Sequence, residues 1–371
     1  MKVSKYKRLI IKNRNIYVAP SSQKLVDYQI HLELKNKYRL IDKNRDYIID
    51  ALLTVLSNKN EKIAKGTSLT ILRFDVKNFF ESINTHKLYQ KLNKSMMLKE
   101  NSLNKVKEIV FSNKVKGLPQ GISFSSSLSE IYLEEFDQLM PIILPNIQLY
   151  ERFVDDIIVV IYGNHKEQKD HLISLVEKLL KNYQLELNDK TQLQVVNKEN
   201  NFDFSYLGYS FKSSNGSNEI DVSVSNDKIK KYIKKIQELF SRYFHSSRNQ
   251  SDVYILYYSL RNLLWKVETK KYSTNKIVSY GFKNSYKRIN RYESYDLLNK
   301  EIAKQINTSR LFSKKNKKLL FSLNLSQAPQ IYNYNKATLS QLHLIANNIG
   351  IPQPLKITKN KLVMKIFDKL Y

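Results

Sequence analysis

Three aspartates follow apolar runs of the chain and could together hold metal ions. Asp75 lies near the end of the apolar run Leu69–Val76. Asp155 follows it by eighty residues, after Phe153-Val154, and is adjacent to Asp156. Carboxylates from two strands can bind two divalent cations a few ångström apart, which is the machinery of two-metal phosphoryl transfer. We expect Mg²⁺, with Mn²⁺ as a substitute, because hard oxygen ligands suit it and phosphate or water completes its coordination.

The elements around these aspartates follow from hydrophobic patterning. The apolar and β-branched run at 69–76 predicts a buried strand that ends at Asp75. Residues 148–153 and 156–162 predict two strands joined by a tight turn at Val154-Asp155, which would place Asp155 and Asp156 at a hairpin tip. Asn84 or Thr85 can cap the helix that follows the first strand.

Turn residues and periodicity predict the remaining elements of the first 224 residues. Helical spacing at 20–57, with Leu25, Tyr28 and Leu32 among the apolar positions, predicts two or three helices. Further predictions are a turn at 117–121, helices at 125–140 and 166–183, a strand at 185–196, and a hairpin of 206–211 with 220–224 that turns at Asn215-Gly216.

Five runs follow one another in a defined order along the chain. They are Phe74-Asp75-Val76-Lys77-Asn78-Phe79-Phe80, Gly117-Leu118-Pro119-Gln120-Gly121 with Ser123 and Ser125, Arg152-Phe153-Val154-Asp155-Asp156, Leu187-Asn188-Asp189-Lys190-Thr191, and Tyr206-Leu207-Gly208-Tyr209. In this order they resemble motifs A to E of a reverse transcriptase of the bacterial group that includes group II intron, retron and abortive-infection (defence-associated) enzymes. The match covers roughly residues 69–211. Motif C has Phe153 where the family most often has Tyr, and the N-terminal finger motifs are hard to place in residues 1–68.

The resemblance implies a role for each motif residue. Asp75 and Asp155 would bind both metal ions with Val76 beside them, Asp156 would complete the catalytic trio, and Lys190 is a candidate proton donor to pyrophosphate. Phe80 would be the steric gate that excludes a ribose 2′-hydroxyl and so favours dNTPs. The expected nucleotide-binding residues are Arg73, Lys77, Phe79, Phe80, Gln120 and Gly121, and the expected primer grip is Tyr206, Leu207 and Gly208.

The residues alone leave some of these roles open. Asp156 can bind metal directly or support the ligands, and one of the adjacent Phe79 and Phe80 can be a core residue. Lys190 can equally be a strand-edge lysine. Arg73 and Lys77 can be solvated charges, and the motif E aromatic residues can serve hairpin packing.

Charge points to a polyanionic partner. The 371 residues carry a net charge of +28, and residues 225–371 hold 29 Lys/Arg against 8 Asp/Glu, a net of +21. Lysine and arginine interleave with tyrosine across 226–330, which suits phosphate contacts and base stacking. A lysine-rich composition or an ordinary helical domain with a solvated basic face would give the same counts. Residues 336–370 weakly resemble SAP-type or Rho-N-type nucleic-acid modules at Leu339, Leu342, Ile345, Ala346, Gly350, Ile351, Lys361, Leu362 and Ile366.

Composition excludes other classes. The chain has no cysteine, so disulfides and cysteine-based zinc sites are impossible. The N-terminus lacks the apolar region of a signal peptide, and no apolar stretch approaches the ~18 residues of a membrane span. We therefore expect a cytoplasmic protein without a membrane partner.

The expected fold is α+β: a right-hand polymerase with fingers and palm followed by an α-helical thumb and C-terminal helical extension. The expected divisions are a helical fingers region at 1–68, fingers and palm at 69–224, a basic helical thumb at 225–330 and a small helical module at 331–371. The expected function is RNA-directed DNA synthesis from dNTPs on a primer 3′-hydroxyl. The resemblance further implies bacterial antiviral defence with a cognate non-coding RNA as template, and the missing maturase and HNH features favour this over a group II intron protein.

Two alternatives stay open at this point. The same site could make DNA without a template or prime on protein, with a tyrosine hydroxyl in place of the primer end. A catalytically idle RNA-binding scaffold would be a different class of protein. The sequence also leaves open whether a partner protein or a second copy of the chain is required.

Overall fold

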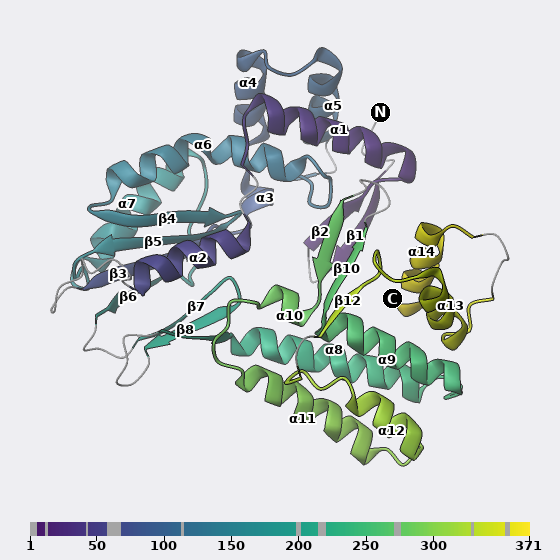
Figure 1. Cartoon of the computed structure of the whole chain (residues 1–371). Helices are drawn as coiled ribbons and strands as arrows, with labels where there is room; N and C mark the ends of the chain where they lie inside the picture. The colour runs from purple at the N-terminus through teal and green to yellow at the C-terminus, as the bar shows by residue number, and fades with distance from the viewer. Residues whose placement is uncertain are drawn as a thin grey trace. The chain divides into compact units, whose positions relative to one another are not determined.

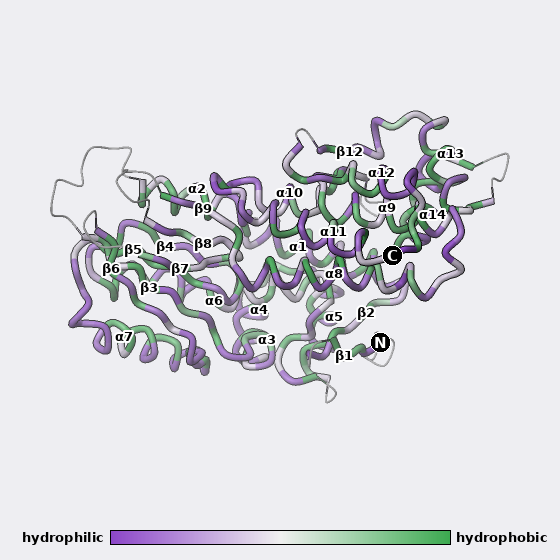
Figure 2. Tube along the Cα trace, turned by 90° about the horizontal axis from the view of Figure 1, so that it is seen from below, coloured by the Kyte–Doolittle hydropathy of each residue, from purple (hydrophilic) through white to green (hydrophobic). Residues whose placement is uncertain are grey.

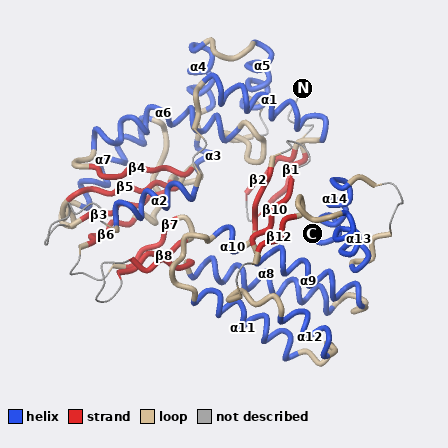
Figure 3. The backbone as a smooth tube through the Cα atoms, viewed as in Figure 1, coloured by secondary structure: helices blue, strands red, loops and turns tan. Residues whose placement is uncertain are grey.

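The computed structural model describes residues 6–11, 14–41, 44–57, 68–112, 115–197, 202–213, 220–270, 276–327, 330–352 and 357–371. The chain divides into two compact units, Met1–Phe202 with Ser213–Ile220, and Asp203–Lys212 with Asp221–Tyr371. Both contain sheets and helices (Figure 3). The expected α+β class with antiparallel sheets is confirmed.

The first unit contains the predicted strand–helix–hairpin–helix–strand order. Its elements are β1 (Lys7–Ile11), β2 (Arg14–Val18), α1 (Ser21–Lys37), α2 (Arg45–Leu56), β3 (Leu69–Asp75), α3 (Phe79–Ser82), α4 (Thr85–Ser95), α5 (Glu100–Val110), α6 (Ser125–Ile143), β4 (Ile147–Phe153), β5 (Asp156–Tyr162), α7 (Lys169–Asn182) and β6 (Gln192–Val196).

An antiparallel sheet with strand order β4-β5-β3-β6 forms the centre of this unit. Helix α2 lies on one face of the sheet and α7 on the other, as Figures 1 and 2 show from two directions. Residues Ile157 to Ile161 of β5 are fully buried, which explains why this strand reads as a continuous apolar run instead of an alternating one. Hydrophilic and hydrophobic residues alternate along α7, so it presents one apolar side to the core (Figure 2).

The predicted helices are largely confirmed, but the inward side of α1 is not the expected one. Leu25 is 58% exposed and Leu32 is 36% exposed, whereas Asp27 is 1% exposed. The Tyr6 hydroxyl donates to Asp27 Oδ1 over 2.8 Å, and Gln23 Nε2 donates to the same oxygen over 3.0 Å. A polar cluster whose members are hydrogen-bonded to one another therefore faces the interior, whereas the hydrophobic spacing predicted that Leu25 and Leu32 would do so.

Two details of the remaining elements differ from expectation. Residues 7–11 and 14–18 pair as the antiparallel hairpin β1–β2, whereas the region 1–68 was expected to be helical. The strand predicted over 185–196 is regular only at Gln192–Val196, and Leu187 makes an isolated bridge with Val76. Turn residues at Asp189 and Lys190 interrupt the strand between these two pairings. The predicted cap is confirmed, since Asn84 accepts from the Lys87 amide over 2.9 Å at the start of α4.

The second unit begins with a sheet of order β7-β8-β9 and continues into helices. Its elements are β7 (Asp203–Tyr206), β8 (Tyr209–Ser213), β9 (Ile220–Val224), α8 (Asn226–Phe244), α9 (Gln250–Leu264), β10 (Lys266–Lys270), β11 (Ile277–Tyr280), α10 (Phe282–Ser285), α11 (Glu293–Thr308), α12 (Lys314–Phe321), β12 (Ile331–Asn333), α13 (Leu339–Asn348) and α14 (Lys359–Leu370).

The strand pairing expected here is present. Strands β8 and β9 are neighbours as predicted, and β7 precedes them through a turn at Leu207-Gly208. The predicted Asn215-Gly216 turn lies outside the described residues. Residues 266–270, 277–280 and 331–333 form a small sheet of order β11-β10-β12 that the sequence patterns did not predict.

The C-terminal helices α13 and α14 pack through the apolar positions expected of a small module. Leu342, Ile345, Leu362 and Ile366 are buried in one cluster, whereas Leu339 is 48% exposed. Across the described part of the chain, no helix is both long enough and apolar enough to cross a membrane.

Candidate active site

The first unit brings its three predicted catalytic aspartates to one end of its sheet. Asp75 at the end of β3 lies directly opposite Asp156 at the start of β5. Asp155 occupies the two-residue turn between β4 and β5, and its carbonyl accepts from the Val76 amide over 3.3 Å. Residues eighty positions apart are thereby tied together by strand register and one backbone bond.

The turn that presents Asp155 has an unusual backbone. Val154 has a φ of 63°, a left-handed conformation that is rare for a β-branched residue. Conformations of this kind cost about 1–3 kcal/mol and persist where surrounding contacts hold them. The hairpin tip therefore holds a strained residue directly before Asp155.

The charges at the tip oppose ionisation of Asp155. Burial raises the pKa of the Asp155 carboxyl, and the nearby charges of Asp156 and Asp75 raise it further, against a lowering by its own backbone hydrogen bond and by Arg14. Arg73 Nη2 lies 3.4 Å from Asp156 Oδ1, so this carboxylate already has a cationic partner. A bound cation would stabilise the ionised form of Asp155.

Residues of motif D hold Asp75 in place. The Asn188 side-chain amide donates to Asp75 Oδ2 over 3.0 Å, and the Asn188 backbone amide donates to the Asp75 carbonyl over 2.9 Å. The Lys77 amide also donates to the Glu186 carbonyl over 2.9 Å. Lys190 is exposed on the turn that follows. The motif resemblance assigned Asn188 no role, and the double contact gives it one: it orients a metal-ligand candidate.

The motif B turn contacts motif A through its backbone. The Leu118 amide donates to the Phe80 carbonyl over 2.7 Å. Gly117 has a φ of 65°, and a Cβ atom placed there would lie 2.2 Å from the same Phe80 oxygen. Only glycine fits at this approach, which explains the residue type at the first position of the turn.

The same turn also contacts the N-terminal hairpin. The Tyr17 amide donates to the Gln120 carbonyl over 2.7 Å, and Ile16 forms a parallel bridge with Gln120. Gly121 has a φ of 97°, and a Cβ atom there would lie 2.6 Å from the Tyr17 carbonyl oxygen. Strand β2 and Arg14 at its start are therefore part of the site, although the sequence shows no clear motif in this region.

The two adjacent phenylalanines have different surroundings. Phe79 is 2% exposed and packs in the core, whereas Phe80 is half-buried with its ring 5.5 Å from that of Phe79. Phe80 is thus the ring with a surface that a nucleotide could contact. Val76 is 2% exposed, so its side chain is unavailable to a ligand.

The residues expected to grip the primer belong to the second unit. Tyr206 and Tyr209 are fully buried, and the Tyr209 hydroxyl donates to the Ser285 carbonyl over 3.2 Å. Leu207 and Gly208 form the turn between them, with φ values of 47° and 85°. The tyrosine side chains pack the hairpin, so any contact with a primer falls to the Leu207-Gly208 turn.

The donor set fits Mg²⁺ once phosphate joins it. Within the described ranges, no group of three or more His, Cys, Asp or Glu side chains is gathered as a ready-made metal site. Asp75 and Asp155 offer hard carboxylate oxygens, while Asp156 is paired with Arg73. Mg²⁺ is usually held by one or two carboxylates together with substrate phosphates, and these two residues meet that requirement.

Comparison with known proteins identifies the family. Residues 7–211 match the reverse transcriptases (RNA-dependent DNA polymerases). The chain belongs to this family. The match extends N-terminally over β1 and β2, beyond the range 69–211 in which the motifs were found. The predicted family, the reverse transcriptases, is therefore confirmed.

Solved structures similar to this reverse transcriptase include telomerases. Apo telomerase from Candida tropicalis shares 14% identity with a TM-score of 0.45, and the match covers 98% of this chain and 68% of the telomerase chain. Telomerase from Candida albicans in complex with a TWJ fragment of telomeric RNA shares 14% identity with a TM-score of 0.42, over 80% of this chain and 57% of the other. The chain thus spans less than two thirds of the Candida albicans protein. No curated protein matches the sequence.

Proposed function

We propose that this reverse transcriptase copies an RNA template into DNA with Asp75 and Asp155 as the ligands of two Mg²⁺ ions. The observation that supports this most directly is the register of β3 against β5, with the Val76–Asp155 backbone bond of 3.3 Å beside it. It brings carboxylates from two motifs to one end of a rigid sheet. Asp75 ends a strand, and Asp155 lies in a two-residue turn that a backbone hydrogen bond ties to that strand, so both positions hold their geometry better than residues of a long loop.

The residues of the site divide the work of nucleotide addition. Bound Mg²⁺ would lower the pKa of the primer 3′-hydroxyl and neutralise charge on the triphosphate. Asn188 orients Asp75, and Arg73 holds Asp156 beside the metal ligands. Phe80 and the Gln120-Gly121 backbone face the nucleotide, with Lys77 near the phosphates and Lys190 as the proton donor to pyrophosphate.

The biological setting is the finer part of the proposal and comes from the motif resemblance. We place the enzyme among the retron-like and defence-associated bacterial reverse transcriptases, acting in the cytoplasm on a cognate non-coding RNA. The template, the DNA product and dNTPs are then its partners. The excess of positive charge in residues 225–371 is consistent with a polymerase that holds an RNA–DNA duplex.

Primer extension on a defined RNA template tests the chemistry. The wild-type enzyme should extend a DNA primer with dNTPs and Mg²⁺, and Asp155→Asn should lower the rate by about a thousandfold or more at every Mg²⁺ concentration. Asp170→Asn is the matched control, because Asp170 is an exposed residue in the first turn of α7. Equal activity of wild type and Asp155→Asn would refute the assignment.

Sequencing of nucleic acid that co-purifies with the enzyme tests the template. DNA complementary to one co-purified RNA, present only with wild type, would support templated synthesis and name the template. DNA of simple or random sequence would favour template-independent synthesis, and a protein–DNA adduct that survives boiling in detergent would favour protein priming. If the wild-type protein extends no primer but still co-purifies with RNA, the alternative of a catalytically idle RNA-binding scaffold would be favoured.

A further inference from the structure

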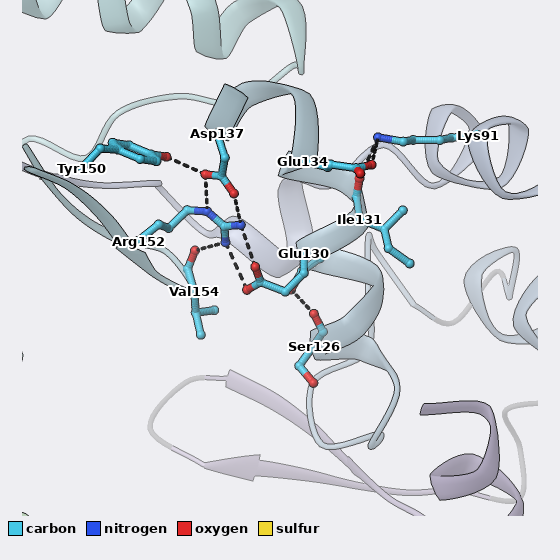
Figure 4. Close-up of polar contacts among 10 residues, drawn as sticks. Lys91, Ser126, Glu130, Ile131, Glu134, Asp137, Tyr150, Arg152 and Val154 are labelled. Carbon is cyan, nitrogen blue, oxygen red and sulfur yellow. Dashed lines mark hydrogen bonds and ion pairs between the residues drawn. The ribbon is translucent and has the colours of Figure 1, made fainter. Parts of the chain in front are cut away.

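Arg152 is a buried cation three residues before Asp155 in the catalytic hairpin. Its side chain has no exposed surface and contacts two carboxylates of helix α6 (Figure 4). Arg152 Nη2 lies 2.7 Å from Glu130 Oε2 and 2.6 Å from Asp137 Oδ2, while its Nε donates to Asp137 Oδ1 over 2.8 Å. The guanidinium therefore bridges two turns of α6 to strand β4.

The arrangement satisfies the requirements of a buried charge. Burial alone lowers the pKa of Arg152, but the hydrogen bond and charge of Asp137, with the charge of Glu130, more than offset this and keep it protonated. The Tyr150 hydroxyl donates to Asp137 Oδ1 over 2.5 Å, so this carboxylate oxygen accepts hydrogen bonds from both Tyr150 and Arg152. Lysine could not replace this pattern, because a point charge lacks the planar fork that meets two carboxylates at once.

One donor of Arg152 is directed at the hairpin tip itself. Arg152 Nη1 donates to the Val154 carbonyl over 3.0 Å. Val154 is the residue with the left-handed φ of 63°, and Asp155 follows it directly. This hydrogen bond fixes the carbonyl of the peptide that joins the strained residue to the metal-ligand candidate.

The other end of the bridge leads to motif B. Helix α6 begins at Ser125, four residues after Gly121, and Ser125 Oγ donates to the Pro119 carbonyl over 2.7 Å. The helix that carries Glu130 and Asp137 is thus anchored to the turn that contains Gln120. Arg152 connects this helix with the turn that contains Asp155.

We propose that Arg152 is a positioning residue, which sets the direction of Asp155 by locking the Val154 turn against the motif B helix. The inference rests on the proposed role of Asp155 as a metal ligand. Arg152 touches neither metal nor nucleotide in this proposal. Its loss acts through Asp155, and displacement of a reacting group by about 1 Å can cost roughly 100-fold in rate.

The test compares Arg152→Lys with a control substitution at Lys91 of α4, whose partners also lie on α6. Lys91 Nζ lies 3.0 Å from Glu134 and 3.4 Å from Glu135 of α6, on a different side of the helix from Arg152 (Figure 4). Lys91→Met removes two ion pairs and a hydrogen bond to the Ile131 carbonyl from α6 without touching the hairpin. The readouts are the unfolding midpoint, kcat, the Mg²⁺ concentration for half-maximal rate, and amide exchange with deuterium in the peptide that contains 152–158.

The expected results separate positioning from bulk stability. Folded Arg152→Lys should lose about 100-fold in kcat, require more Mg²⁺, and exchange the Val154–Asp156 amides faster, whereas Lys91→Met should keep kcat within about twofold. Folded Arg152→Lys with wild-type kcat, Mg²⁺ requirement and exchange would overturn the proposal. If Arg152→Lys does not fold, Glu130→Gln weakens the same bridge from a carboxylate that is 31% exposed, and unchanged readouts there would overturn it equally.

Amide exchange also distinguishes this proposal from the proposed function. If wild type extends no primer, the metal-ligand assignments lack support, yet faster exchange at 152–158 in Arg152→Lys still shows the locking contact. If wild type is active and the exchange pattern does not change, the locking contact is wrong and the assigned chemistry stands.

Discussion

At the scale of single residues, Asp155 is where stability and chemistry conflict. Burial, and then the charges of Asp156 and Asp75, raise its carboxyl pKa above the value in the unfolded chain. A raised pKa favours folding only while the carboxyl is protonated in both states, below about pH 4. That contribution is lost as the pH rises through the folded-state pKa, so ionised Asp155 destabilises the enzyme at neutral pH.

We therefore predict that Asp155→Asn stabilises the metal-free protein while it abolishes synthesis. The midpoint of thermal unfolding at pH 7.5 with chelator should rise by a few degrees, because the amide carries no charge to bury. The gain should shrink as the pH is lowered toward about 4. Asp170→Asn should not change the midpoint. An Asp155→Asn midpoint at or below wild type across the pH range would mean that the buried charge of Asp155 does not destabilise the fold.

The adjacent pair Phe79 and Phe80 allows a second prediction. Phe80→Val should raise ribonucleotide incorporation relative to dNTPs by about tenfold or more with little loss of stability, because it removes the half-buried ring. Phe79→Val should instead cost about 1–3 kcal/mol of unfolding free energy, because Phe79 is 2% exposed. Competition between ATP and dATP on one template measures the first effect, and chemical denaturation measures the second. The gate assignment is wrong if only Phe79→Val relaxes the preference for deoxynucleotides.

Residue types at motif positions allowed the aspartates, Gln120 and Gly121 to be predicted, because their chemistry is tied to short local runs. The roles of Asn188, Arg14 and Arg152 could not be predicted in this way. Their roles depend on partners far away in sequence: Asn188 contacts Asp75 over 113 positions, and Arg152 meets Glu130 and Asp137 from the preceding helix. Local patterns do not contain that information.

At the scale of elements, the contact of β2 with the motif B turn is the feature that ties the N-terminal hairpin to the site. We predict that Gly121→Ala breaks it, since a Cβ atom would lie 2.6 Å from the Tyr17 carbonyl oxygen at a φ of 97°. The expected cost is about 1–3 kcal/mol of stability together with lower activity. Gly163→Ala is the control, because its φ of 105° is similar but its nearest neighbour is the His165 side chain at 3.2 Å.

Denaturation midpoints and the KM for dNTP measured on both variants check this. Gly121→Ala should raise the KM and lose stability, whereas Gly163→Ala should show only the strain of its backbone. Equal effects of the two substitutions would mean that the contact with Tyr17 contributes nothing of its own.

The elements that the sequence predicted well are those with simple patterns. Strands β3 and β5 are buried apolar runs, and α7 has a clear apolar side. The predictions were wrong where polar residues are buried, as at Asp27 in α1, and where a turn interrupts pairing, as at Asp189-Lys190. Hairpin β1–β2 was missed because its burial pattern is mostly exposed, so it lacks the alternation that marks a strand.

At the scale of the whole molecule, the distribution of charge predicts how nucleic acid is held. Four lysines are exposed along the N-terminal half of α8. They are Lys230, Lys231, Lys234 and Lys235. If all four contact a single strand, their replacement by glutamine should weaken RNA binding and reduce the slope of log affinity against log salt by about 3.

Fluorescence anisotropy with a labelled RNA across a range of KCl concentrations measures this slope. Exposed lysines of the α7 region serve as the control set with the same change of charge. They are Lys166, Lys169, Lys178 and Lys181. Equal slopes for the two quadruple variants would indicate that net charge alone governs binding, without a preferred surface on α8.

The central position of β3 has a consequence during translation. This strand pairs with β5 and β6, and both are synthesised after it. At roughly 5–20 residues per second, the ribosome needs on the order of ten seconds after Asp75 to complete the turn at Asp155. Through that interval an apolar strand with two unpaired edges is part of the nascent chain, and such edges are where aggregation begins. Expression yield should therefore depend on the speed at which residues 76–162 are translated, even though no amino acid is changed.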